Sequence, residues 1–78
     1  MEYRISYHWD AGHWTRITGG SLKDCHKYIQ LNASEMEDAL EEWEDAFFTL
    51  EYCNNNTRVA VWEGTPTELL DIILELDS

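Results

Sequence analysis

Alternating hydrophobic and polar residues near the beginning of the chain predict a β-hairpin. Every second residue from Tyr3 to Trp9 is hydrophobic, which is the period-two pattern of a strand with one buried face. Asp10-Ala11-Gly12 provides residues that favour a turn, and residues 13–18 are expected to form a returning strand. Gly19-Gly20 is expected to end the hairpin.

Two helices are predicted in the middle of the chain. Ser21 and Asp24 resemble a helix start, because the hydroxyl can accept a hydrogen bond from a free backbone N–H and the acid lies near the positive end of the helix dipole. The spacing of hydrophobic residues carries this first helix to about residue 32. Ser34 and Glu37 form a capping box for a second helix. Its hydrophobic stripe comprises Met36, Ala39, Leu40, Trp43 and Phe47.

The C-terminal part of the chain is predicted to hold two more strands and a third helix. Leu50 and Tyr52 indicate one strand, the three asparagines at 54–56 a turn, and residues 59–61 a second strand. Thr65 is the expected N-cap of the last helix, with Pro66 at its first position and Glu68 completing a capping box. The buried stripe of this helix is expected to comprise Leu69, Leu70, Ile73 and Leu76.

The predicted element order is β-β-α-α-β-β-α. We therefore expect an α+β fold in which an antiparallel sheet of three to four strands packs against three helices, within a single domain spanning residues 1–78. A sequence echo accompanies this order, because Thr15-Arg16-Ile17 and Thr57-Arg58-Val59 each precede a glycine and a capping box. General residue preferences at hairpin-to-helix junctions explain the echo, and a duplicated ββα unit is the alternative.

Composition indicates a folded chain that favours cationic partners. Hydrophobic residues make up 44% of the sequence, and its ten aromatic side chains can each bury about 150–250 Å². The chain also has 16 acidic and 5 basic residues, which give a formal net charge of −11. Direct binding to nucleic acid or to an anionic membrane surface is disfavoured, since both carry negative charge. A cationic protein would instead be attracted, and its encounter accelerated.

The chain has no pattern typical of a catalytic, cofactor or metal site. His8 and His13 lie across a turn and Cys25-His26 are adjacent, so the paired spacing of a zinc site is missing. A reactive thiolate needs nearby positive charge, whereas the field of this protein is negative. We expect a non-enzymatic protein without cofactor or metal, with Cys25 and Cys53 as reduced thiols in the cytoplasm. An enzyme that uses paired carboxylates is a minor alternative.

A dense acidic segment is the strongest candidate for a functional site. Seven carboxylates occur within eleven residues, with no lysine or arginine between them: Glu35, Glu37, Asp38, Glu41, Glu42, Glu44 and Asp45. Like charges three or four residues apart cost a helix about 0.2–0.5 kcal/mol per pair, so stability alone does not favour this pattern. A solvated face on an acidic protein is one explanation. The other, which we adopt as a prediction, is that these seven residues bind a cationic partner.

Size, acidity, aromatic-rich composition and the lack of catalytic motifs give the chain a resemblance to a functional class. It resembles the small acidic inhibitors made by phages and mobile elements, including anti-CRISPR and antirestriction proteins that mimic DNA. The resemblance includes no residue-by-residue match. It implies inhibition of a nucleic-acid-binding complex of the host cell, such as one containing a CRISPR effector subunit, by occupation of its basic channel.

Two other binding functions fit the same sequence. An immunity protein or antitoxin would use the same charges to neutralise a basic toxin or nuclease. A small structural or accessory protein would instead bind through exposed aromatic side chains such as Trp14 or Trp62.

Overall fold

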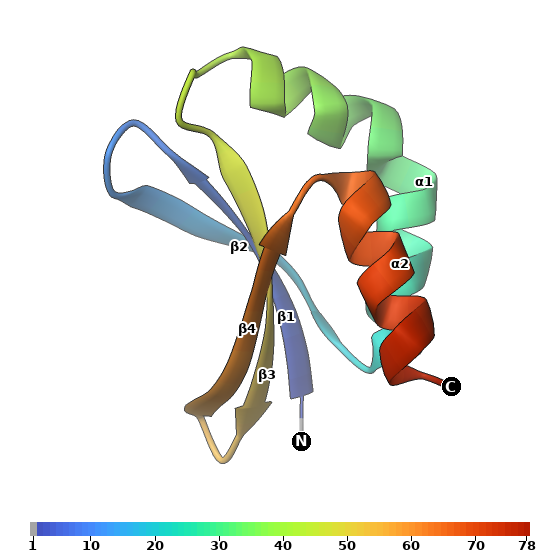
Figure 1. Ribbon diagram of the computed structural model, residues 1–78. Helices are drawn as coiled ribbons and strands as arrows, with labels where there is room; N and C mark the ends of the chain where they lie inside the picture. The colour runs from blue at the N-terminus through green and yellow to red at the C-terminus, as the bar shows by residue number, and fades with distance from the viewer. Residues whose placement is uncertain (1) are drawn as a thin grey trace.

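Four antiparallel strands form one sheet in the order β2-β1-β3-β4, and two helices pack on one face of it (Figure 1). The structure is a computed structural model that describes residues 2–78. The elements are β1 (Glu2–Trp9), β2 (His13–Gly20), α1 (Leu22–Glu41), β3 (Phe47–Asn54), β4 (Thr57–Gly64) and α2 (Pro66–Leu76). The α+β class and the antiparallel sheet are confirmed. The prediction of three helices is wrong, because the described residues contain two.

The hydrophobic core lies between the sheet and the two helices. Ile5 of β1 and Leu50 of β3 are partners at the centre of the sheet, and both are fully buried. The helix side chains that complete the core are Cys25, Ile29, Met36, Leu69 and Ile73. Leu76 does not join the buried stripe of α2 as predicted, because it lies exposed in the last turn.

α1 runs without a break through the region for which the sequence predicts two helices. Asn32 lies inside the helix, and its side-chain Nδ2 donates a hydrogen bond to the carbonyl oxygen of Tyr28, 2.9 Å away. Ser34, the predicted N-cap of a second helix, is an exposed residue inside α1. The pairing of Ser34 with Glu37 therefore caps nothing, and the two predicted helices are one helix of 20 residues.

The end of α1 comes earlier than the sequence predicts. Glu42 is the C-cap, and its backbone N–H donates to the carbonyl oxygen of Ala39 at 3.3 Å. Trp43 then lies exposed in the following loop, and Phe47 begins β3, where its ring stacks on His8 with 4.5 Å between ring centroids. If α1 continued past Glu42, it would add further acidic residues at the negative end of its dipole, which is unfavourable. The chain instead forms β3, whose pairing with β1 buries core side chains.

The fold consists of a ββα unit that occurs twice. Each hairpin leads through a glycine into a helix with a capping box, formed by Ser21 and Asp24 in α1 and by Thr65 and Glu68 in α2. A β-carbon at Gly20 would lie 2.7 Å from Oδ2 of Asp24, and one at Gly64 would lie 2.9 Å from Cβ of Glu68. The glycines of the sequence echo are thus needed at both junctions, because the capping acid fills the space of a side chain.

The two units differ mainly in their hairpin loops. The first loop has three residues, Asp10 to Gly12, and the second has two, Asn55 and Asn56. All five have positive φ angles, which suits the asparagines of the second loop but strains Ala11 of the first.

Within residues 2–78, neither helix combines the length and the apolar composition needed to cross a bilayer.

Candidate functional site: an acidic surface on α1

All seven acids of the predicted site are exposed, and they follow one another along one end of α1 and the loop after it. Four lie on the last turns of the helix, one is its C-cap and two lie in the loop. We call these seven residues the acidic surface: Glu35, Glu37, Asp38, Glu41, Glu42, Glu44 and Asp45. Successive helix residues are rotated by about 100°, which places Asp38 and Glu41 opposite the buried stripe that ends at Met36, and Glu35 and Glu37 on its two flanks. The helix therefore presents these carboxylates outward.

The acidic surface lies where negative charge destabilises a helix. The C-terminal end of a helix carries a partial negative charge, and the last turn of α1 holds no basic residue. The ion pairs within residues 2–78 all lie elsewhere and join Arg4 to Glu2, His13 to Asp10, and Arg58 to Glu51. The acids of this surface are thus unneutralised by any described side chain, and stability does not account for their concentration at this end.

Asp45 differs from the other acids because the fold itself uses its carboxylate. Its two oxygens accept hydrogen bonds from the backbone N–H groups of Asp10 and Ala11, at 3.1 and 2.6 Å. These two residues have φ angles of 47° and 53°, a conformation that L-residues other than glycine adopt at a cost. Asp45 therefore holds the β1–β2 loop against the end of α1. The other six members have no such bond among the described residues.

Tyr7 fixes the acidic end of α1 to the sheet. Its hydroxyl donates a 2.7 Å hydrogen bond to the carbonyl oxygen of Ala39, which also accepts the backbone N–H of the C-cap Glu42. Burial raises the pKa of Tyr7, and the nearby carboxylates of Glu42 and Asp45 raise it further. The acidic surface is therefore carried by a rigid attachment to β1 and not by a free helix end.

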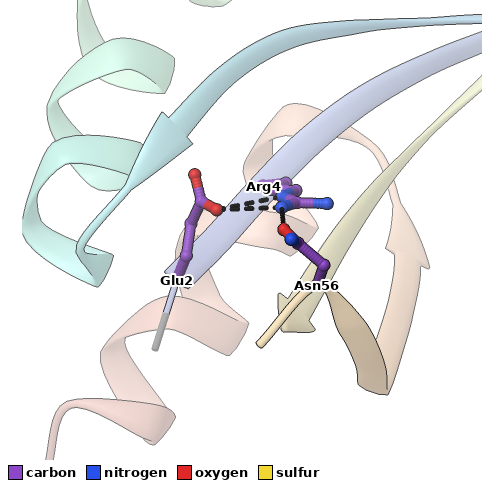
Figure 2. Close-up of polar contacts among 3 residues, drawn as sticks. All are labelled: Glu2, Arg4 and Asn56. Atoms are coloured by element: carbon purple, nitrogen blue, oxygen red, sulfur yellow. Dashed lines mark hydrogen bonds and ion pairs between the residues drawn. The ribbon is translucent and has the colours of Figure 1, made fainter. Parts of the chain in front are cut away.

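The arginines lie on the sheet face that the helices leave uncovered. Side chains alternate between the faces of a strand and residues paired in register share a face, so Arg4, Arg16 and Arg58 lie opposite the core. Figure 2 shows how Arg4 is held: its guanidinium donates to Oε1 of Glu2 at 3.0–3.1 Å and to Oδ1 of Asn56 at 3.1 Å. This bond to Asn56 ties β1 to the β3–β4 loop, so Arg4 has a structural role.

The thiols and imidazoles form no reactive cluster in the described part of the chain. Burial raises the pKa of Cys25 to about 11, and the carboxylates of Asp24 and Glu2 add to the increase, so its thiol stays protonated near neutral pH. Cys53 is also buried and unbridged. His8 is held at 3.0 Å from Oγ1 of Thr49. Within residues 2–78 no three His, Cys, Asp or Glu side chains lie close enough to hold a metal ion.

The two tryptophans that sequence analysis offers as anchors for an accessory protein are not equivalent. Trp14 of β2 is 60% exposed. Trp62 of β4 is partly buried and packs against the core, so it is not the exposed anchor that was expected.

Comparison of the chain with protein-family models, with curated proteins and with solved structures gives no match. The chemistry of the described residues is therefore the basis for assigning a function.

Proposed function

We propose that this chain is a non-enzymatic acidic inhibitor that binds the basic, nucleic-acid-binding site of a host defence complex in the host cytoplasm. The proposal makes it similar in action to anti-CRISPR proteins that mimic DNA. The observation that carries it is the row of exposed carboxylates at the negative end of α1, without counter-ions among residues 2–78. A surface that weakens its own helix is expected to be kept for binding.

The geometry of a helix supports mimicry of a phosphate backbone. Residues four apart on α1, such as Glu37 and Glu41, are separated by about 6 Å along the axis, which is close to the distance between successive phosphates of one strand. Arginine and lysine side chains that hold phosphates would form charge-assisted hydrogen bonds to these carboxylates equally well. The inhibitor would act by occupying the site, and no chemical step is needed.

The positions of the cations support a protein partner over nucleic acid. Arg4 is engaged by Glu2 and Asn56, and Arg58 lies 4.0 Å from a carboxylate oxygen of Glu51. Lys23 and Lys27 lie on the first turns of α1, on the same helix as the acidic surface. No broad basic face is left in the described chain for a phosphate backbone, so we infer that the chain competes with nucleic acid and does not bind it.

Charge reversal on α1 tests this function. The variant Glu37→Lys, Asp38→Lys, Glu41→Lys should lose affinity for the inhibited complex by on the order of 100-fold, because three charge-assisted contacts become repulsive. The fold should persist, since positive charge favours the C-terminal end of a helix. The measurement is DNA binding by purified CRISPR effector complexes, titrated with each variant. Asp45 is left unchanged because it holds the β1–β2 loop.

The matched control reverses three exposed acids elsewhere, in the variant Asp71→Lys, Glu75→Lys, Asp77→Lys. It changes the net charge equally but leaves the acidic surface intact, so inhibition should be retained. Equal inhibition by both triple variants would contradict the proposal, as would inhibition that does not weaken with added salt. If the chain neutralises an isolated basic nuclease toxin and no defence complex, the immunity-protein function is the correct one.

A further inference from the structure

The outer edge of β4 is open. β4 is the last strand of the sheet, and its only backbone partner within residues 2–78 is β3. Eight residues long, it contains neither proline nor lysine, two of the devices that natural edge strands use to prevent pairing with other chains, but it does contain one bulge, at Val59. Val59 and Val61 are 59% and 49% exposed. Such a strand offers a row of free N–H and C=O groups and an apolar surface beside them.

The charges of β4 balance, although the protein as a whole is strongly acidic. The strand has one base, Arg58, and one acid, Glu63, in a chain with three times as many acids as bases. In a regular strand these two side chains would lie on opposite faces, since they are five residues apart. The register shift opposite Tyr52-Cys53 adds one residue to β4. Arg58 and Glu63 thereby pair with Cys53 and Thr49 of β3 and share the uncovered face with Val61.

This arrangement is self-complementary. If a second β4 is placed antiparallel to the first with a two-fold axis at Val61, each valine meets its own copy on the uncovered face. Val59, the extra residue of the register shift, has no partner on β3; if it is skipped on the outer edge too, Arg58 of each copy lies opposite Glu63 of the other and two ion pairs form. On the helix face, the large Trp62 of each copy lies opposite the small Ala60 of the other, and these two residues do share that face. Charge, size and face therefore match at these three kinds of pair, and Val59 has no residue opposite it.

We propose that β4 pairs edge to edge with β4 of a second copy, which gives a two-fold symmetric dimer with one continuous eight-stranded sheet. Such an interface is closed, because the same edge is used by both copies. The opposite edge does not have this property: β2 contains Arg16 but no acid, so it cannot form reciprocal ion pairs with itself. The proposed interface involves no member of the acidic surface, so it goes beyond the inhibitory function and stands or falls independently.

Sedimentation equilibrium over a range of protein concentrations tests the dimer. The wild-type chain should approach twice the monomer mass as concentration rises, while Glu63→Arg should stay monomeric because it places like charges opposite each other. Glu75→Arg on α2 is the matched control and should dimerise at least as well as wild type, since it lowers the same net repulsion. A wild-type chain that is monomeric throughout, or a Glu63→Arg variant that dimerises like Glu75→Arg, would overturn the proposal.

A charge swap separates a lost contact from a lost fold. Arg58→Glu alone should also remove the dimer, whereas the double variant Arg58→Glu, Glu63→Arg should restore it, because the ion pairs are re-formed with their signs exchanged. Hydrogen exchange gives a second measurement: amides along β4 should exchange more slowly in concentrated than in dilute protein, and those of β2 should not change. Failure of the double variant to dimerise, or protection of β2 instead, would overturn the pairing of β4.

Discussion

At the scale of single residues, Asp45 shows how one position can be taken for part of a binding surface and yet serve the fold. In the sequence it is the last of seven acids, and nothing distinguishes it from Glu44 beside it. In the structure its carboxylate accepts two N–H groups from a loop more than thirty residues earlier. The strain of Ala11 at positive φ is offset by these bonds, which no local sequence pattern signals.

Replacement of Asp45 by alanine should therefore lower the stability of the protein. We expect the free energy of unfolding to fall by about 1–3 kcal/mol, because the two charge-assisted hydrogen bonds that offset the strain of Asp10 and Ala11 are lost. Glu44→Ala is the control, with an expected change within about 0.5 kcal/mol. Urea unfolding followed by circular dichroism provides the measurement. Similar losses in the two variants would show that the loop is held by other contacts.

At the scale of the elements, local signals predicted both true helix starts and a false one at Ser34, and long-range contacts decided the ends. The hairpins and both true capping boxes depend on neighbouring residues, which is why Ser21 and Thr65 were predicted correctly as N-caps. The residues from Asn32 to Phe47 depend on partners far away, because Tyr7 binds the last turn of α1 and His8 stacks on Phe47. The exposure of the acidic surface was predictable from the helical pattern, whereas the separate task of Asp45 was not.

The two serines with a capping pattern should respond in opposite ways to alanine. Ser21→Ala removes the acceptor for the N–H of Asp24 and should cost about 0.5–2 kcal/mol of stability. Ser34→Ala should leave stability unchanged or raise it by a few tenths of a kcal/mol, since alanine is the better residue inside a helix. Thermal unfolding of both variants measures this difference. A loss for Ser34→Ala as large as that for Ser21→Ala would indicate that a second helix does begin at residue 34.

At the scale of the whole molecule, charge is arranged by element. Acids concentrate at one end of α1, three arginines lie on the uncovered sheet face, and the edge strand β4 carries one acid and one base. A dimer through β4 would join two sheets while leaving both acidic surfaces free, so one assembly could present two inhibitory sites. Binding of two sites on one complex would then gain from effective concentration without any new contact.

The same charge distribution predicts that salt acts in opposite directions on folding and on inhibition. Repulsion within a chain of net charge −11 opposes the folded state, and the screening length falls from about 30 Å at 0.01 M to about 10 Å at 0.1 M salt. The melting temperature should therefore rise between these concentrations, by roughly 4–8 °C if repulsion costs about 1 kcal/mol. The melting temperature of the Glu37→Lys, Asp38→Lys, Glu41→Lys variant should rise less, because this variant has less charge to screen.

Inhibition by the wild-type chain should weaken over the same range of salt concentration. Since the protein is then more stable, unfolding cannot be the cause. A melting temperature that falls with salt would contradict this account of the charge.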